Sequence, residues 1–139
     1  MSKTLAIIKP DAVKRNLTGA ILAKITNKNF RICAIKMLQI SYAEASNFYK
    51  VHNGKPFFDD LVKFMASGPC IPIVLEKINA VADFRKLIGA TDPKEAEEGT
   101  IRNLFAISKN HNVIHGSDSD ENAAYEINFF FSSKEIFEV

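Results

Sequence analysis

The sequence is poor in several features that mark particular protein classes. Its 139 residues include no tryptophan and only two cysteines. Cys33 and Cys70 both lie in strand-like runs without the spacing of a zinc motif. We therefore expect buried free thiols in a reducing compartment, and the sequence argues against a disulfide framework or a zinc centre. No repeat, linker or low-complexity tract interrupts the chain.

Long apolar runs and a strong charge imbalance are also missing. The first apolar run, Leu5–Ile8, ends at Lys9 and is far too short for a signal peptide or a membrane span, so we expect a cytoplasmic protein with no membrane partner. The formal net charge is only +2 and the cations are dispersed, so no specific nucleic acid is expected as a partner. Hydrophobic content of 47% suits one globular domain covering residues 1–139, which buries about two-thirds of its unfolded surface.

Four segments have the pattern of strands. The continuous apolar run Thr4–Ile8 predicts an interior strand, followed by a turn at Lys9-Pro10-Asp11. Phe30–Leu38 predicts a second strand by alternation, and Ile71–Leu75 a third, with Pro72 near its start if the strand is central. Val113–His115 predicts a short last strand.

Helical patterns fill the intervals between these strands. We expect a helix capped by Thr18, one capped by Ser41 with capping-box spacing to Glu44, one that begins at Phe57, one capped by Asn79 with Gly89 closing the helix, and one that begins at Asp120 with an end near Phe130. The second and third of these form a helical hairpin around the break at Asn53–Pro56. Thr91–Asn112 is a long irregular stretch with at most a short helix over residues 101–107, and long loops in compact domains tend to be functional. The element order fits an open sheet covered by helices, in either a flavodoxin-like or a ferredoxin-like layout.

The stretch Asn112–Ser119 stands out as a place to present a side chain. His115 follows the apolar pair Val113 and Ile114 and precedes Gly116, where the backbone can turn sharply. Ser117 and Ser119 are candidate N-caps of the next helix, and oriented N–H groups at a helix start suit an anionic ligand such as phosphate. A structural histidine is the alternative. Other polar residues stand at element ends where a site would collect them: Lys9, Arg85, Thr91, Arg102 and Asn112.

Several of these residues also have simpler explanations. Lys9 suits a solvated strand end, Phe57 suits the core as well as a stacking platform, and Glu126 suits an exposed helix face. Arg85 lies beside an apolar stripe, from which it can snorkel or reach a phosphate.

Six motifs together resemble the nucleoside diphosphate kinase family. Asn112–Ser119 (NVIHGSDS) is similar to its active-site signature, and Thr4–Asp11 (TLAIIKPD) to its first strand and lysine. The others are Pro56–Phe58, Ser67–Pro69, Gly89–Pro93 and Gly99–Arg102, in the same order and spacing over nearly the whole chain. The resemblance implies the ferredoxin-like βαββαβ fold, of class α+β, with a four-stranded antiparallel sheet covered by helices, an inserted helical hairpin and a long loop before the last strand.

The resemblance also implies an activity and roles for individual residues. The chain would transfer the γ-phosphate of a nucleoside triphosphate, typically ATP, to nucleoside diphosphates by a ping-pong mechanism through a phosphohistidine on His115. Glu126 and Ser117 would orient the histidine ring, and Tyr49 would support the histidine or Lys9. The nucleotide would be held by Lys9, Phe57, Arg85, Thr91, Arg102 and Asn112. An imidazole suits the covalent role because its pKa, about 6.5, leaves it nucleophilic at neutral pH.

Mg²⁺ is the expected cofactor and would be held mainly by the nucleotide phosphates, with Asp118 as the nearest protein group to contact it through water. Homohexamers or homotetramers are expected, the loop around Pro93 contributing in hexamers. One departure from the family pattern is Asn103-Leu104, where Gly-Asp is usual, which removes an expected loop salt bridge. Two rival functions are a ferredoxin-like regulatory module that only binds a nucleotide, and a nucleic-acid-binding protein with steep salt dependence.

Overall fold

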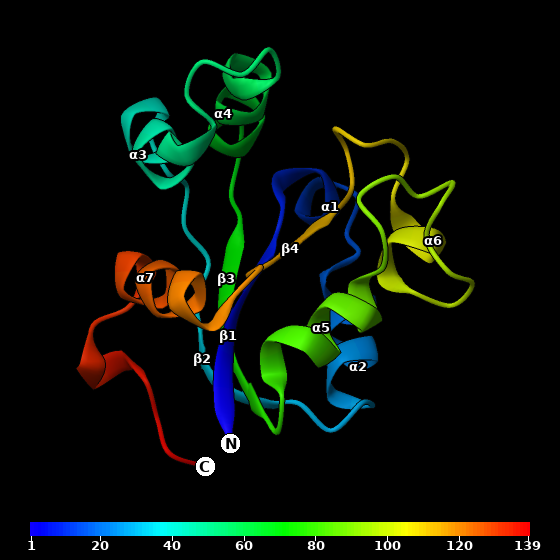
Figure 1. Ribbon diagram of the computed structural model, residues 1–139, viewed down its shortest axis with the longest axis vertical. Helices are drawn as coiled ribbons and strands as arrows, with labels where there is room; N and C mark the ends of the chain where they lie inside the picture. The colour runs from blue at the N-terminus through cyan, green and yellow to red at the C-terminus, as the bar shows by residue number, and fades with distance from the viewer.

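The computed structural model describes residues 1–139 and has at its centre a four-stranded antiparallel sheet (Figure 1). The strands are β1 (Ser2–Ile8), β2 (Arg31–Ile35), β3 (Ile71–Lys77) and β4 (Ile114–Gly116). They lie in the order β2-β3-β1-β4, and all neighbouring pairs are antiparallel. This is the ferredoxin-like βαββαβ sheet, so the flavodoxin-like alternative, which requires parallel strands, is wrong.

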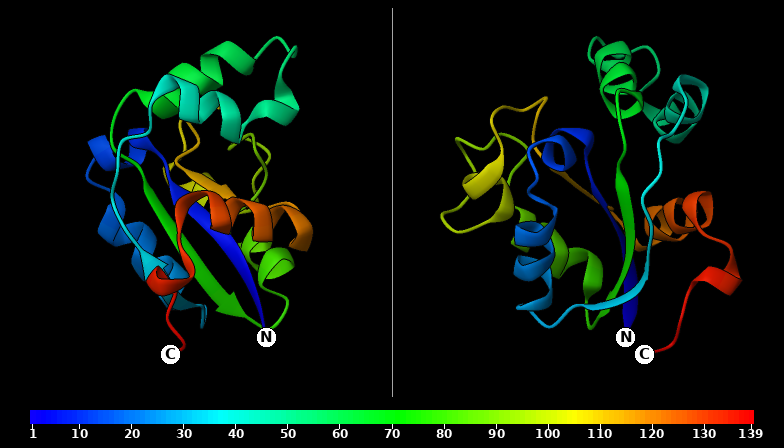
Figure 2. Two further views of the ribbon diagram at one scale, coloured as in Figure 1. Left: turned by 90° about the vertical axis from the view of Figure 1, so that its left-hand side faces the viewer. Right: turned by 180° about the vertical axis from the view of Figure 1, so that it is seen from behind.

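Helices cover both faces of the sheet. They are α1 (Pro10–Lys14), α2 (Thr18–Thr26), α3 (Tyr42–Phe48), α4 (Phe58–Ala66), α5 (Ala80–Ile88), α6 (Ile101–Phe105) and α7 (Asp120–Phe130), with 3-10 turns at Lys50–His52 and Ser133–Glu135. α7 lies on one face, whereas α2 and α5 lie on the other (Figures 1 and 2). The hairpin α3–α4 stands beyond one end of the sheet, and both chain termini lie at the opposite end (Figure 2). None of the helices has the length and apolar character needed to cross a membrane.

Strand β1 contributes to two separate hydrophobic cores. Leu5 and Ile7 belong to a cluster shared with the hairpin and α7, whereas Ala6 and Ile8 belong to a cluster shared with α2 and α5. Successive side chains of a strand point to opposite faces, so a strand covered on both sides needs apolar residues at every position. The uninterrupted apolar run of β1 is therefore the signature of a central strand. It also holds Lys9 at a fixed place where the strand ends.

Three predictions, for the central strand, the hairpin and the end of α5, are confirmed. β3 lies between β2 and β1, and Pro72 is its second residue, where its missing N–H costs least. The capping box is formed, with Ser41 Oγ accepting from the Glu44 N–H at 3.0 Å and Glu44 Oε1 accepting from the Ser41 N–H at 2.9 Å. Gly89 ends α5 with a φ of 86°, as its C-terminal position predicted.

The edge strand is shorter than its alternating pattern predicted. β2 spans Arg31–Ile35, and its pairing with β3 shifts register between Ile32 and Ala34. A bulge inserts a residue into one strand, so Cys33 and Ala34 are both buried although they are adjacent. The simple alternation predicted over Phe30–Leu38 is therefore wrong.

Three local predictions before helices are also wrong. Lys9-Pro10-Asp11 is not a plain turn, because Pro10 starts α1. Thr18 is the first residue of α2 and makes no side-chain cap. Asn79 does stand at the N-cap of α5, but it is left-handed (φ 55°) and its side chain does not cap. The free N–H of Ala80 instead donates to Ser2 Oγ at 2.9 Å, so the cap comes from the first strand.

Candidate active site

A cavity of about 870 Å³ lies between the hairpin and one end of the sheet. At that end it is bounded by the residue after β1, by β4 and by the loop that precedes β4. Its walls come from segments far apart in the chain. The predicted site residues that line it are Lys9, Tyr49, Phe57, Thr91, Arg102, Asn112 and His115. The fold thus brings together most of the residues that the resemblance singled out.

His115 is held by a chain of hydrogen bonds from behind. Its Nε2 lies 2.8 Å from Oε1 of Glu126, and the Ser117 hydroxyl donates to the same oxygen at 2.7 Å. Ser117 is itself fixed, because the Leu5 N–H donates to its Oγ at 3.2 Å. A carboxylate only accepts, so Nε2 is the donor and the neutral ring carries its lone pair on Nδ1. The side chains of His115 and Glu126 are only 16% and 15% exposed.

The backbone before His115 makes a strained turn that the sequence did not reveal. Val113 has a φ of 66°, which is unfavourable for a β-branched residue. The Ile114 N–H donates to the carbonyl of Asn112 at 2.8 Å, and the Lys9 N–H donates to the Val113 carbonyl at 2.9 Å. This tight turn carries the side chains of Asn112 and His115 into the same cavity.

Gly116 does not make the predicted sharp turn, and Ser117 does not cap the next helix. Gly116 lies in β4, and a Cβ there would come within 2.9 Å of the Phe84 ring. Glycine is therefore required for close packing against α5, and the sharp turn lies at Val113 instead. Ser117 is fully buried and does not cap α7. Ser119 is the N-cap, and its Oγ accepts from the Asn122 N–H at 3.0 Å.

Lys9 is a buried cation in the cavity wall. It is 7% exposed, and its Nζ donates to Oδ1 of Asn112 at 2.8 Å. Burial, assisted by the nearby charge of Arg102, lowers the pKa of Lys9 to about 7. The Asn112 amide in turn donates to the carbonyl of Thr91 at 3.4 Å. The solvated strand end considered for Lys9 is therefore wrong.

Arg102 is fixed by backbone carbonyls. Its two terminal nitrogens donate to Gly89 at 3.0 Å and to Ile114 at 2.8 Å, while Nε is buried without a partner. Burial, together with the charge of Arg85, lowers the pKa of Arg102 to about 10. The guanidinium therefore remains charged at neutral pH and faces the cavity in one orientation.

Tyr49 and Phe57 differ sharply in exposure. Tyr49 is buried, its ring packs edge-on against His115 with centroids 6.3 Å apart, and its hydroxyl has no partner. Burial raises the pKa of Tyr49. Phe57 is 43% exposed, which excludes the core position considered for it. The ring centroids of His52 and Phe57 are 5.3 Å apart, and the Lys55 ammonium lies 5.8 Å from the centroid of the Phe57 ring.

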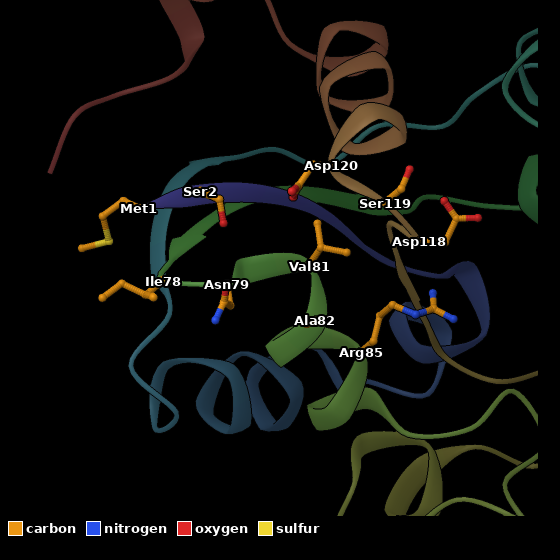
Figure 3. A pocket seen from close by; sticks show the side chains of 10 residues that line it. All are labelled: Met1, Ser2, Ile78, Asn79, Val81, Ala82, Arg85, Asp118, Ser119 and Asp120. Carbon is orange, nitrogen blue, oxygen red and sulfur yellow. The ribbon is translucent and has the colours of Figure 1, made fainter.

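Arg85 and Asp118 do not line this cavity. They line a second, more open one of about 680 Å³ between the start of α5 and the start of α7 (Figure 3). In that view both side chains lie toward the same end of the hollow. Their charges nevertheless reach the first cavity, since Arg85 acts on the pKa of Arg102 and Asp118 on that of His52. They therefore lie within electrostatic reach of the first cavity.

At Asn103-Leu104, where the family pattern has a loop salt bridge, the side chain of Asn103 forms hydrogen bonds instead. Asn103 Oδ1 accepts from the Gly99 N–H at 3.2 Å, and its Nδ2 lies 3.5 Å from the Ala96 carbonyl as donor. The amide thus ties the long loop to α6 without a salt bridge. Leu104 is 47% exposed.

Sequence reasoning missed a row of cavity residues on the hairpin. Asp60, Lys63, Phe64 and Ser67 line the cavity from one side of α4 and the turn after it. Their spacing of i, i+3, i+4 and i+7 defines one helix face next to Phe57, so the signal was present in the sequence. His111 also lines the cavity, and its ring stacks on Phe64 with centroids 4.9 Å apart.

Comparisons with known proteins agree with one another. The family model for nucleoside diphosphate kinase matches residues 2–136. The chain is 58% identical over 139 residues to the nucleoside diphosphate kinase of Prosthecochloris aestuarii, covering 100% of this chain and 99% of that protein. It is 58% identical over 134 residues to the one from Salinibacter ruber, covering 96% and 94%.

Solved structures give the same result. The fold matches that of the Aquifex aeolicus nucleoside diphosphate kinase with a TM-score of 0.95 and 44% identity, over 97% of this chain and 98% of that one. It also matches a halophilic nucleoside diphosphate kinase from Halobacterium salinarum in complex with CDP, with a TM-score of 0.95 and 37% identity, over 99% and 92%. The likeness extends over nearly the whole chain in both sequence and structure.

Proposed function

Because this chain belongs to the nucleoside diphosphate kinase family and transfers phosphate from nucleoside triphosphates to nucleoside diphosphates, we propose that His115 is its phosphate carrier. The observation that carries the proposal is the arrangement of the His115 ring. Nε2 is hydrogen-bonded to Glu126, and the ring lines a cavity that is also lined by Lys9, Arg102 and Asn112. The whole chain, residues 1–139, acts as one kinase domain.

The reaction consists of two matched displacements. In the first, Nδ1 of His115 attacks the γ-phosphorus of the triphosphate, the P–N bond forms, and the bond to the β,γ-bridging oxygen breaks to release the diphosphate. Glu126 stabilises the positive ring. In the second, a terminal oxygen of another diphosphate attacks the phosphorus and the P–N bond breaks. The nucleotides bind in turn at one site, which gives ping-pong kinetics.

The polar residues around His115 bind different parts of the nucleotide. Arg102, Arg85 and Thr91 hold the phosphates, and the forked guanidinium groups match the phosphate oxygens better than an ammonium does. Asn112 and Lys9 reach the ribose hydroxyls, with Lys9 also near the phosphates. Tyr49 supports the ring of His115 through their edge-on contact.

Phe57 supports the base by stacking and offers no hydrogen bonds to its edge. We therefore expect broad use of acceptors, so that ATP supplies GTP, UTP, CTP and the deoxy forms. The CDP bound to the Halobacterium salinarum enzyme agrees with a pyrimidine acceptor.

Mg²⁺ enters with the nucleotide. The phosphate oxygens of the nucleotide would be its main ligands, because Mg²⁺ is a hard cation that prefers oxygen ligands. Asp118 would contact such an ion through water. When bound, the ion neutralises charge on the phosphates. The chain works in the cytoplasm as a homohexamer or homotetramer.

Labelling with γ-³²P-ATP tests the proposal. The protein without acceptor should take up label that is acid-labile and base-stable, and GDP should then remove it as GTP. His115→Ala should take up none, whereas the control His111→Ala, which changes another histidine beside the cavity, should still be labelled. Label that survives in His115→Ala, or that is acid-stable, contradicts the proposal. Nucleotide binding without any label indicates the regulatory module instead.

A further inference from the structure

Asp11 carries a buried carboxylate for which the reaction described above has no use. It lies in the first turn of α1, two residues after Lys9. Both of its carboxylate oxygens are buried and neither has a hydrogen-bond partner. Leaving a buried polar group unpaired costs about 1–3 kcal/mol, and more for a charged one, so such a group calls for a reason.

The neighbouring ammonium lacks a counter-charge of its own. The side-chain partner of Lys9 Nζ is the neutral amide oxygen of Asn112. The charged groups that act on Lys9 are Arg102 from α6, which repels it, and Asp11 from α1, which attracts it. Arg85 lies beyond Arg102 and adds further positive charge. Asp11 is therefore the one acid that acts on Lys9 at this end of the cavity.

We propose that Asp11 is a positioning residue that increases the fraction of Lys9 that is charged while the cavity holds no phosphate. The inference rests on the proposed function, in which Lys9 binds the nucleotide. After the product triphosphate leaves, His115 carries no phosphoryl group and the cavity holds no nucleotide, and during that interval Asp11 is the acid that offsets the charge of Lys9. Once phosphates bind, their own charge takes over this task.

The consequence is a dependence of nucleotide capture on pH. Burial and Arg102 already bring the pKa of Lys9 to about 7, and loss of Asp11 removes the opposing influence. A nucleotide that needs charged Lys9 binds in proportion to the charged fraction. For Asp11→Asn we expect kcat/KM to fall about tenfold at pH 8 and about twofold at pH 6, with a smaller change in kcat at saturating nucleotide.

Rescue by charge separates this effect from a structural one. Asp11→Glu restores the negative charge and should recover most of kcat/KM at pH 8. The control Asp83→Asn removes an acid from the first turn of α5, where it pairs with Lys77, and should leave the pH profile unchanged. If Asp11→Asn does not fold, the smaller Asp11→Ser provides the same loss of charge.

A direct measurement requires no turnover. The ε-carbon NMR signal of Lys9, assigned by its absence in Lys9→Arg, is titrated in nucleotide-free protein. The midpoint in Asp11→Asn should lie below that of the wild type. An unchanged midpoint, or equal losses of kcat and kcat/KM at every pH, overturns the inference. If His115 proved not to carry phosphate while the Lys9 midpoint still depended on Asp11, the proposed function alone would fail.

Discussion

The two sides of the cavity differ. Toward the sheet, it is bounded by polar side chains that form hydrogen bonds with one another, whereas toward solvent it is bounded by side chains with few hydrogen bonds. The inner wall consists of Lys9, Asn112 and His115, with Ser117 and Glu126 behind the histidine. Hydrogen bonds of 2.7–2.8 Å join Lys9 to Asn112, and join Glu126 to both His115 and Ser117. The rim consists of Phe57 and Thr91, which are both exposed, and the exposed Arg85 lies in the neighbouring cavity. The inner wall is formed before any nucleotide binds, and the rim is left to adjust.

This difference matches what each half has to do. Phosphoryl transfer depends on a nucleophile in line with phosphorus and on charges at fixed positions, so a rigid wall lowers the barrier. The rim meets bases of different size, and its exposed side chains leave room for them. The comparison predicts that changes in the inner wall lower kcat, whereas changes in the rim raise KM.

Glu126→Ala should have the largest effect of the inner-wall changes that keep the nucleophile. Without the carboxylate, nothing fixes the proton on Nε2 or stabilises the positive ring, so kcat should fall about 10²-fold or more. The nucleotide does not contact Glu126, so KM should change little. The control Glu121→Ala removes an exposed glutamate from the same helix. Steady-state kinetics with ATP and GDP decide, and a kcat within twofold of wild type would contradict the rigid-wall account.

Lys9→Met should weaken nucleotide use and yet stabilise the free protein. The pKa of Lys9 is about 7 when folded and about 10.5 in the unfolded chain, so the unfolded state binds more protons between these values. The free-energy cost of burying the charged ammonium in the folded protein is therefore fully present below pH 7, and it is lost as the pH rises toward 10.5.

Thermal unfolding of nucleotide-free protein measures this cost. Lys9→Met should raise Tm by about 3–6 °C at pH 6 and by clearly less at pH 9. Lys14→Met, on the exposed side of α1, is the control for adding a methionine. An equal gain at both pH values would mean that packing, and not charge, sets the difference between wall and rim.

The sequence predicted the fold and the inner wall well because their signals are local or periodic. The apolar run of β1, the capping box at Ser41 and the glycine end at Gly89 each arise from neighbouring residues. The pairing of His115 with Glu126 was anticipated through the family resemblance, since periodicity alone left Glu126 on either face of α7.

The features that were missed depend on contacts between distant segments. The strained φ of Val113 is held in part by a hydrogen bond from Lys9, far away in the sequence. Gly116 is required by the Phe84 ring on another helix. The unpaired carboxylate of Asp11 becomes visible only when the atoms around it are known. Such constraints leave no periodic trace in the chain.

Phe57→Ala should have the smallest effect, confined to the rim. Stacking on an aromatic ring is worth about 1–3 kcal/mol per base, so KM for the diphosphate should rise about 5- to 10-fold at the lower end of that range. The inner wall is untouched, so kcat should stay within about threefold. Because every base has a π-face, ADP, GDP, CDP and UDP should all be affected, and Phe57→Tyr should behave as wild type. Since the ring is already 43% exposed, the melting temperature should hardly move. A loss restricted to purines, or a fall in kcat with KM unchanged, would show that Phe57 does more than support the base and would remove the distinction between wall and rim.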